Sequence, residues 1–326
     1  MNIAIIGAGN IAGNMARTLR GMKARGQNVE LYAVASRELA KAQAFAEAEG
    51  FQKAYGSYEE MLKDDGIDLV YVATPHSHHA EHMKLCLEHG RAILCEKAFT
   101  GNARQAEEVL ALAKEKGIFV AEAIWTRYMP WRQMVLELLD SGIIGEPKVL
   151  TGNLAYSMEN KERVYKPELA GGALLDLGVY TLNFASMIFG DDVERMESTV
   201  QMMSSGVDLT ENISLYYRDG RSAHVVSSAA ARMDRRGLVS GTEGYLTVNN
   251  VNNPTVIEVF DSNDQLLKHV EVPEQITGFE YQVEACMKAL AEGKLECYEM
   301  PHSEILYIMR QMDALRAQWG MVYPFD

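Results

Sequence analysis

The sequence predicts an α/β protein with two domains, and three observations support this. Short apolar segments alternate with helix-forming segments over residues 1–123. A glycine-rich turn, GAGNIA at residues 7–12, follows the first apolar segment directly. After residue 123 the pattern changes to segments in which apolar and polar residues alternate. We therefore expect a doubly wound parallel sheet in residues 1–123 and an α/β domain with a mostly antiparallel sheet in residues 124–326.

The first domain is predicted from five apolar segments that read as buried strands. They are NIAII (2–6), VELYAVAS (29–36), IDLVYVAT (67–74), AILC (92–95) and IFVAEA (118–123). Helices are expected around MARTLRGM, over RELAKAQAFAEAEG with Gly50 as a C-cap, around HHAEHMKLCLEHG, and over residues 102–116. Continuously apolar strands separated by helices are typical of a parallel sheet that is covered on both faces.

The second domain is predicted to be rich in strands. VLTGNLAYSM (149–158), GLVSGTEGYLTVNN (237–250) and TVIEVFDSND (255–264) have strand character. TENISLYYRDG and RSAHVVSSAA read as a pair around Asp219 and Gly220. Helices are expected near residues 279–291 and 303–319. The alternation indicates an antiparallel sheet with one covered face.

Composition excludes several classes of partner. The chain has 45 acidic and 31 basic residues, a formal net charge of -14, which disfavours nucleic acid and anionic membranes as partners. Its four cysteines form no CxxC pair, and its N-terminus lacks the features of a signal peptide. We find no apolar run of the roughly 18 to 20 residues that a membrane span needs. We therefore expect a soluble, cytoplasmic protein.

The glycine-rich turn predicts a dinucleotide site. In GxGxxA, Gly7 permits a tight turn, Gly9 lets the backbone approach a pyrophosphate, and Ala12 allows close packing of helix on strand. The intervening Asn10 and Ile11 would open the helix whose N-terminus faces the phosphates.

The end of the second strand bears on which dinucleotide is bound. NAD-binding proteins usually place an acidic residue there, but this chain has Ser36 and Arg37, which suit the 2′-phosphate of NADP. Two alternatives remain open. Ser36 could cap the following helix, and Arg37 could stack on adenine with either cofactor. We expect NADP as the preferred cofactor and NAD as the alternative.

Histidines are concentrated in TPHSHHAEHMKLCLEHG (74–90). His78 and His82 are spaced i,i+4, which can chelate zinc, but the motif HExxH is absent and Cys86 stands alone. We expect no metal site, and most of these histidines to be solvated helix positions. Because the segment follows a parallel strand, we place Thr74, Pro75, His76 and His79 at the cofactor.

Candidate catalytic residues come from both domains. Glu96 and Lys97 end the strand in RAILCEKAF, at the sheet edge where the nicotinamide should lie. Asp176 and Tyr180 are spaced i,i+4 and are expected on one helical face. The candidate substrate-binding residues are Trp125 and Arg127 at the mouth of the expected cleft, with Arg163 and Phe279. Ordinary packing and a surface salt bridge are the alternatives for Trp125 and Arg127. For the other pair, Tyr180 could simply pack in the core and Asp176 could cap or pair locally.

These motifs together resemble a known family. GAGNIA, TPxxxH (74–79), Glu96-Lys97 and AGGALLDLGVY (170–180) are similar to the motifs of the glucose-fructose oxidoreductase, inositol dehydrogenase and rhizopine-catabolism protein family. EAIWTRYMP (122–130), with tyrosine at position 180, resembles the dihydrodiol dehydrogenase branch. The resemblance implies a Rossmann domain followed by a domain with a large open sheet, one face of which commonly forms a homodimer interface.

The resemblance also implies roles for individual residues. Lys97 would orient substrate and lower the pKa of Tyr180, and Tyr180 would carry the hydroxyl proton while hydride moves to or from the cofactor. Asp176 would lie in the same site. A free tyrosine, with a pKa near 10, is a weak base at neutral pH, and a nearby cation favours its ionised form. One departure is Ala98, where the family has proline after the lysine.

We therefore expect an NAD(P)-dependent oxidoreductase. It would interconvert a secondary alcohol and a carbonyl on a small-molecule sugar, cyclic polyol or dihydrodiol. The alternative, kept open by Ala98, is a non-catalytic NADP-binding sensor or regulatory protein of the same fold. A zinc hydrolase built on the histidines is a third hypothesis.

Overall fold

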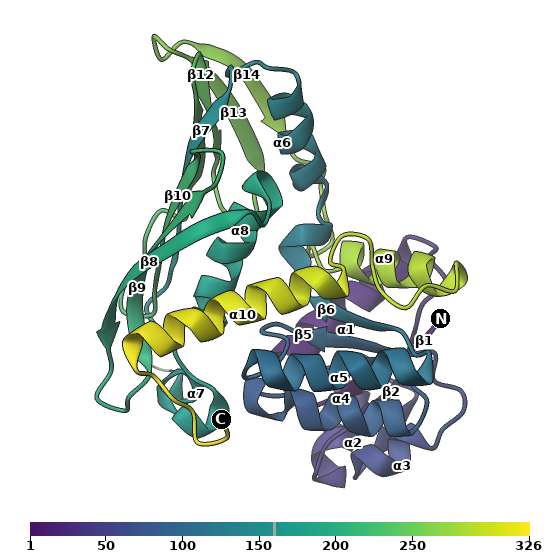
Figure 1. Ribbon diagram of the computed structural model, residues 1–326. Coiled ribbons are helices and arrows are strands. Elements are labelled where there is room, and N and C mark those ends of the chain that lie inside the picture. Colours follow the sequence, from purple (N-terminus) through teal and green to yellow (C-terminus); the bar gives the residue numbers. More distant parts are fainter. Residues whose placement is uncertain (159–160) are drawn as a thin grey trace. The chain divides into compact units, whose positions relative to one another are not determined.

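The computed structural model describes residues 1–158 and 161–326 and contains two compact units (Figure 1). The first comprises Met1–Trp125 and Gln275–Met309, and the second comprises Thr126–Glu274 and Arg310–Asp326. The predicted division into residues 1–123 and 124–326 follows the chain continuously, whereas the segment Gln275–Met309 packs with the first unit. Each unit is described by itself.

The described part of the first unit contains a six-stranded parallel sheet with the order β3-β2-β1-β4-β5-β6. Its strands are β1 (Asn2–Ile6), β2 (Glu30–Ala35), β3 (Lys53–Tyr55), β4 (Leu69–Val72), β5 (Ile93–Glu96) and β6 (Val120–Ala123). Strands β4, β5 and β6 are buried along their whole length, because helices cover both faces. The predicted doubly wound sheet is confirmed.

The helices of this unit follow the predicted segments closely. They are α1 (Asn10–Ala24), α2 (Leu39–Glu49), α3 (Tyr58–Leu62), the turn η1 (His76–His78), α4 (His79–Glu88), α5 (Ala103–Lys116) and α9 (Glu280–Ala291). In Figure 1, α4 and α5 lie side by side over one face of the sheet. Gly50 ends α2 with a φ of 86°, as expected of a C-cap glycine, and Asn102 caps α5 by accepting from Gln105 N. The short elements β3 and α3 were not predicted.

The strand register aligns the carboxyl ends of the central strands. Ile6 of β1 pairs with Ala35 of β2 and with Val72 of β4, and Val72 pairs with Cys95 of β5. The loops that follow these four strands therefore leave the sheet along one edge. In an open α/β sheet this edge is where ligands bind.

The described part of the second unit contains an eight-stranded sheet with the order β14-β13-β12-β11-β7-β10-β9-β8. Its strands are β7 (Pro147–Ala155), β8 (Val193–Met202), β9 (Asp208–Tyr217), β10 (Ser222–Ser228), β11 (Gly237–Gly241), β12 (Gly244–Val248), β13 (Val256–Asp261) and β14 (Leu266–Glu271). Neighbouring strands are antiparallel except for β7 and β10, which are parallel. The mostly antiparallel sheet and the β9–β10 hairpin are confirmed, whereas the edge strands β8 and β14 were not predicted.

Helical segments of the second unit are α6 (Pro130–Asp140), α7 (Glu162–Tyr165), the turn η3 (Pro167–Leu169), the π-helical turn η4 (Leu174–Gly178) and α8 (Val179–Phe189). The turn η2 (Trp125–Tyr128) spans the boundary between the units, and α10 (His302–Trp319) contributes residues to both. Contrary to our expectation, residues 167–189 are long and apolar enough to span a membrane. However, the apolar window in this segment is 94% buried inside the protein, as in a core helix.

Helix α8 packs on the sheet through the Phe184 side chain, which lies against two glycines. Gly152 of β7 and Gly237 of β11 are paired across the strands. An added Cβ would meet the Phe184 ring at 3.2 Å from Gly152 and at 2.3 Å from Gly237. The missing side chains thus make the space that the fully buried Phe184 fills.

Candidate active site

The glycine turn after β1 has the geometry that its sequence predicted. Gly7 has a φ of +106°, and a Cβ there would lie 2.8 Å from the Ala73 carbonyl oxygen, so the position requires glycine. Gly9 is the N-cap of α1, and within the described residues no atom lies within 4 Å of where its Cβ would be. Ala12 is fully buried, as expected where α1 packs closely on the sheet.

The start of α1 fits a dinucleotide pyrophosphate. Its first turn, which includes Asn10 and Ile11, holds no acidic residue, and no described side chain caps it. The first N–H groups are therefore available to an anion. A cavity of about 410 Å³ lies beside this turn and is lined by Gly9, Asn10 and Arg17, among others. Arg20 also lines it and is paired with Glu49.

Ser36 and Arg37 follow β2 at the same edge. Ser36 is buried, and its N–H donates to the Tyr55 carbonyl oxygen at 3.2 Å. The N-cap of α2 is Glu38, so Ser36 does not cap that helix. Arg37 is exposed. Its positive charge lowers the pKa of His82, and it also lowers that of Tyr58, although burial has the larger effect there and raises the pKa of Tyr58 overall. Arg37 therefore lies near the starts of α3 and α4.

The histidine segment is more buried than expected. We expected most of its five histidines to be solvated, and this is wrong for His76, His79 and His82, which are 8%, 0% and 7% exposed. The His82 ring packs edge-on against Tyr58 at 4.8 Å. Burial lowers the pKa of His82 to about 4, because the charged ring would lose its hydration.

His79 connects two loops at the sheet edge. Its Nε2 lies 2.8 Å from the Thr74 carbonyl oxygen, in the Thr74-Pro75 loop, and its Nδ1 lies 2.9 Å from the Ala98 carbonyl oxygen. A neutral imidazole can donate to only one of the two. Burial lowers the pKa of His79, while the two carbonyl oxygens oppose this shift. The contacts tie the loop after β4 to the residue that follows Lys97.

Glu96 and Lys97 lie at the carboxyl end of β5, as predicted. Glu96 is buried and accepts a hydrogen bond from the Tyr71 hydroxyl of β4. Tyr71 was missed, although a tyrosine in the otherwise apolar IDLVYVAT was a visible signal. Lys97 is half-buried, and the Lys97–Ala98 peptide bond is cis.

Trp125 and Phe279 pack together in the first unit. Their ring centroids are 5.0 Å apart in an edge-to-face arrangement. Gly278, with a φ of +92°, lies under Trp125, where a Cβ would approach the indole to 2.5 Å. The sequence placed both aromatic residues in the second domain, whereas both belong to the unit that carries the glycine turn.

The second unit holds the remaining candidates. Tyr180 lies in the first turn of α8 and is 7% exposed. Asp176 lies in η4, which runs directly into α8, so Asp176 and Tyr180 are on one continuous helical segment whose turn at Asp176 is π-helical rather than α-helical. Arg163 Nη2 donates to Asp176 Oδ2 at 2.9 Å.

Arg127 is buried, contrary to the alternative that it forms a surface ion pair. Its Nη1 donates to Asn183 Oδ1 at 2.9 Å, and Asn183 Nδ2 donates to the Val179 carbonyl oxygen at 2.7 Å. Asn183 was missed. Its spacing of three residues from Tyr180 could have identified it, since such positions are neighbours on a helix.

The structure thus gathers the predicted residues into two sets. The first unit carries the glycine turn, Ser36, Arg37, the Thr74–His79 loop, Glu96, Lys97, Trp125 and Phe279. The second unit carries Arg127, Arg163, Asp176 and Tyr180.

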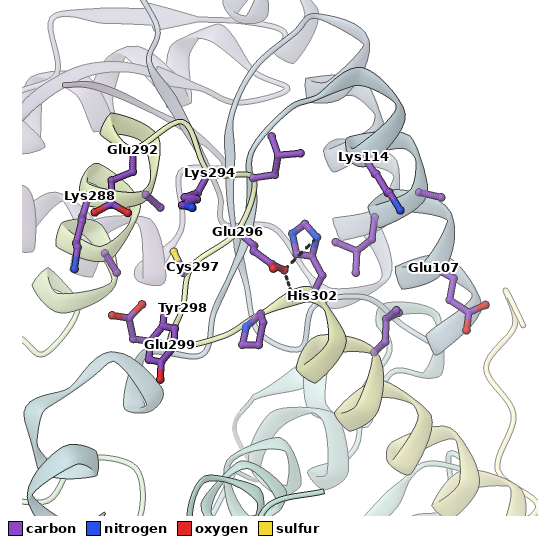
Figure 2. A pocket seen from close by; sticks show the side chains of 17 residues that line it. Glu107, Lys114, Lys288, Glu292, Lys294, Glu296, Cys297, Tyr298, Glu299 and His302 are labelled. Atoms are coloured by element: carbon purple, nitrogen blue, oxygen red, sulfur yellow. Dashed lines mark hydrogen bonds and ion pairs between the residues drawn. The ribbon is translucent and has the colours of Figure 1, made fainter.

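A larger cavity of the first unit lies elsewhere. Figure 2 shows this cavity, of about 1040 Å³, between α5, α9 and the segment that leads into α10. Lysine and glutamate side chains both line it, including Glu107 and Lys114 of α5, Lys288 of α9, and Glu292, which follows α9. Among the residues described, none of the predicted site residues lines it.

The histidine segment and the other potential metal ligands form no metal site among the described residues. Across residues 1–158 and 161–326, no group of three or more His, Cys, Asp or Glu side chains is placed to hold a metal ion. The buried rings of the histidine segment instead make hydrogen bonds and ring contacts.

Comparison with known proteins shows the family of this chain. Residues 1–123 match the oxidoreductase family with an NAD-binding Rossmann fold, and residues 133–247 match the GFO/IDH/MocA C-terminal domain. The chain is 32% identical to trans-1,2-dihydrobenzene-1,2-diol dehydrogenase of Mus musculus over 99% of this chain and 98% of the mouse protein. It is 36% identical to the protein of that name from Sus scrofa over 75% of this chain and 72% of that protein.

Solved structures share the whole fold. KijD10, a 3-ketoreductase from Actinomadura kijaniata, is 27% identical with a TM-score of 0.86, over 97% of both chains. The aldose-aldose oxidoreductase of Caulobacter crescentus, at 20% identity, has the same fold with a TM-score of 0.86 over 99% of both chains. With its parallel sheet, its glycine turn and its second open sheet, this chain belongs to the GFO/IDH/MocA family of oxidoreductases.

Proposed function

We propose that this chain is an NADP-preferring dehydrogenase or reductase that interconverts a secondary alcohol and a carbonyl on a sugar, cyclic polyol or dihydrodiol. The relatives support this substrate class, since they are named as a trans-1,2-dihydrobenzene-1,2-diol dehydrogenase and a 3-ketoreductase. The observation that carries the proposal is the placement of two residues. Lys97 ends a parallel strand at the ligand edge of the sheet, and Tyr180 stands on a buried helix beside the Asp176 turn.

The proposed chemistry assigns the proton to Tyr180. The bound nicotinamide supplies or accepts the hydride. In reduction, the Tyr180 hydroxyl would give its proton to the carbonyl oxygen as the carbon gains hydride, and in oxidation the phenolate would take the proton from the substrate hydroxyl. The Lys97 ammonium would orient the substrate oxygen and favour the phenolate. Asp176 would lie in the same site, held by Arg163.

Several features support NADP over NAD. The end of β2 carries Ser36 and Arg37 in place of an acidic residue. Arg37 is exposed at the ligand edge and is not taken up by the α2 cap. The structure of KijD10 contains NADP. We further propose a cytoplasmic protein that forms a homodimer or higher homo-oligomer through the open face of its second sheet.

Replacing Tyr180 with phenylalanine tests the mechanism. Because the ring and its packing remain, Tyr180→Phe should bind NADPH with unchanged affinity. Loss of the proton carrier should lower kcat by roughly 10²-fold to 10⁴-fold. NADPH affinity is measured by fluorescence titration, and kcat by NADPH oxidation across a panel of sugar, polyol-derived and dihydrodiol-derived carbonyl compounds.

A matched control is Tyr298→Phe, since Tyr298 is 92% exposed and far in sequence from every candidate residue. That variant should keep the wild-type kcat. A Tyr180→Phe enzyme with wild-type turnover would overturn the proposed role of Tyr180. NADPH binding without turnover of any substrate by the wild type would favour the sensor alternative.

A further inference from the structure

Two acidic residues are buried in the second unit, and in the described part of the chain no ion pair joins either of them to a basic side chain. Asp208 and Glu211 of β9 are both 0% exposed. They are three residues apart, which in a regular strand would put them on opposite faces. The β8–β9 register shifts at this point, since Gln201 pairs with Thr210 but Met202 pairs with Asp208. The shift lets both carboxyl groups face the same buried layer.

The two carboxyl groups lie against the segment that carries Asp176. Asp208 Oδ2 accepts the Leu174 N–H at 2.6 Å, at the start of η4. A Cβ on Gly172 would lie 2.1 Å from Asp208 Oδ1, and a Cβ on Gly178 would lie 2.8 Å from Glu211 Oε1. The acid pair thus fills the space left by one glycine before η4, Gly172, and by the glycine that ends it, Gly178.

The hydrogen bonding of the pair requires a proton. Within the described residues, Asp208 Oδ1 and both carboxyl oxygens of Glu211 have no hydrogen-bond partner of ordinary geometry. The Ser227 hydroxyl interacts with Glu211 and lowers its pKa, but this effect is smaller than that of burial. Two adjacent buried carboxylates would also repel each other strongly. A single shared proton supplies a donor and removes one charge. Burial raises the pKa of Asp208 to about 6, and burial together with the charge of Asp208 raises that of Glu211 well above its ordinary value.

Other titratable groups near the pair are accounted for. Tyr323 lies closest, with its hydroxyl donating to the Gly171 carbonyl oxygen at 2.6 Å. Behind it, Arg316 is paired with Asp326 and Asp313. On the η4 side, Asp176 is paired with Arg163. On β10, the cross-strand neighbour of Glu211 is Ser227, a neutral residue whose hydroxyl contacts Thr181 of α8 at 3.0 Å.

We propose that Asp208 and Glu211 share one proton at neutral pH and act as positioning residues, holding the Gly172–Gly178 segment so that Asp176 and Tyr180 keep their working geometry. Their effect on turnover rests on the proposed function of Tyr180. The sharing of the proton does not, and it is tested separately.

The shared proton is tested by infrared spectroscopy and by unfolding. Wild-type protein at pH 7 should show the band of a protonated carboxyl group, and Glu211→Gln should lack it. The folded pair keeps a proton that carboxyl groups in the unfolded chain release above their ordinary pKa. Unfolding therefore releases a proton, and the unfolding constant of the wild type should rise with pH, relative to that of Glu211→Gln. The relative rise should approach tenfold per pH unit.

Turnover then tests the positioning role. Glutamine retains a donor toward Asp208 and leucine does not, so Glu211→Leu should lower kcat at least tenfold and Glu211→Gln should recover most of that loss. NADPH affinity should be unchanged in both, because the glycine turn belongs to the other unit. The control is Glu271→Gln, which removes an exposed carboxyl group on β14. It should match the wild type in every measurement.

The outcomes separate the two proposals. The shared proton would be ruled out if the wild type lacked the infrared band of a protonated carboxyl group and if the unfolding constants of wild type and Glu211→Gln depended on pH in the same way. This conclusion would hold even if Tyr180→Phe is inactive. Equal kcat in the Leu and Gln variants would overturn the positioning role. If Glu211→Leu does not fold, Asp208→Asn takes its place. This variant removes the charge of the group that accepts the Leu174 N–H, and a wild-type kcat in it would overturn the positioning role. Full turnover by Tyr180→Phe would instead remove the proposed mechanism and leave the infrared result standing.

Discussion

In our proposal, the choice between NADP and NAD depends on the side chain of Arg37. The residue follows β2 at the ligand edge and is exposed, so its guanidinium can reach a 2′-phosphate without paying for burial. Its neighbours Tyr58 and His82 are ring systems rather than carboxylates. A bidentate phosphate contact is strong and geometrically specific for arginine. The same residue stacked on adenine would serve both cofactors equally.

Arg37→Ala distinguishes these two roles. If Arg37 contacts the 2′-phosphate, the variant should lose about tenfold or more in NADPH affinity, the range of a lost charged hydrogen bond, while NADH affinity changes little. Both affinities are measured by fluorescence titration. Arg104→Ala serves as the control, since it removes an exposed arginine paired with Glu108 on α5. Equal loss of NADPH and NADH affinity would mean that Arg37 makes no phosphate contact.

The distance between helix α8 and the sheet is set by the contact between Phe184 and the paired glycines of β7 and β11. Tyr180 lies one helical turn before Phe184, so the seat of this ring sets the position of the candidate catalytic hydroxyl. Thr181 adds a second attachment through its contact with Ser227 of β10. The helix itself is buried on nearly every side and has no polar face to orient it. Its orientation therefore depends on these shape-specific contacts.

Gly237→Ala tests the packing of Phe184 against the sheet. The new methyl group would approach Phe184 Cζ to 2.3 Å and Val248 Cγ2 to 2.9 Å, so overpacking should lower the free energy of unfolding by about 1–3 kcal/mol. Urea unfolding measures the change. Adding Phe184→Leu should recover part of the loss, giving a favourable coupling between the two positions.

Gly13→Ala is the matched control, because a Cβ there meets only Glu49 Oε1 at an ordinary 3.7 Å. Since alanine favours a helix, this variant should gain about 0.5–1 kcal/mol. A Gly237→Ala protein as stable as the wild type would show that Phe184 moves aside freely.

Each unit holds a buried titratable site whose protonation changes its stability near neutral pH, and the two sites act in opposite directions: His82 in the first unit and the Asp208–Glu211 pair in the second. In the first unit, the folded state lowers the pKa of His82 to about 4, so the unfolded state binds more protons and stability is lost as the pH falls below the ordinary value near 6.5. In the second unit, the raised pKa values of Asp208 and Glu211 mean that the folded state binds more protons. Stability there is lost as the pH rises through the folded values.

Hydrogen exchange can resolve the two responses within one chain. From pH 7 to pH 5, after correction for intrinsic rates, protection in α4 should fall and protection in β9 and α8 should rise, each by up to about 2 kcal/mol. His82→Asn keeps a polar partner for Thr74 and should flatten the first response without altering the second. Glu211→Gln should do the reverse. Parallel responses of the two units in the wild type would contradict this assignment.

Much of the fold could be predicted because the central strands are apolar along their whole length. Strands β1, β2 and β4 fall within the predicted segments, and Gly50 and Asn102 end and begin helices at the expected places. The strands that were missed lie at sheet edges. Strand β14 is almost entirely exposed and β8 largely so, and β3 has only three residues, so none shows a strong apolar pattern.

The candidate site could be predicted only in part. Motif residues such as Gly7, Lys97 and Tyr180 are recognisable because their chemistry depends on position after a strand or on a helix. Tyr71 and Asn183 were missed because they act on Glu96 and Arg127 across elements. The burial of His82 was also missed, since its spacing on α4 does not reveal that Tyr58 covers it.

The sequence by itself determined the two sheet classes, the dinucleotide turn and the family, because these depend on local patterns: apolar runs, glycine spacing and the order of short motifs. Only the tertiary structure decided that residues 275–309 belong with the first unit, that η4 is a π-helical turn, and that Asp208 and Glu211 meet beneath it. The physical reason is that these features arise from contacts between residues distant in the chain, including a register shift between two strands, and local patterns carry no record of such contacts.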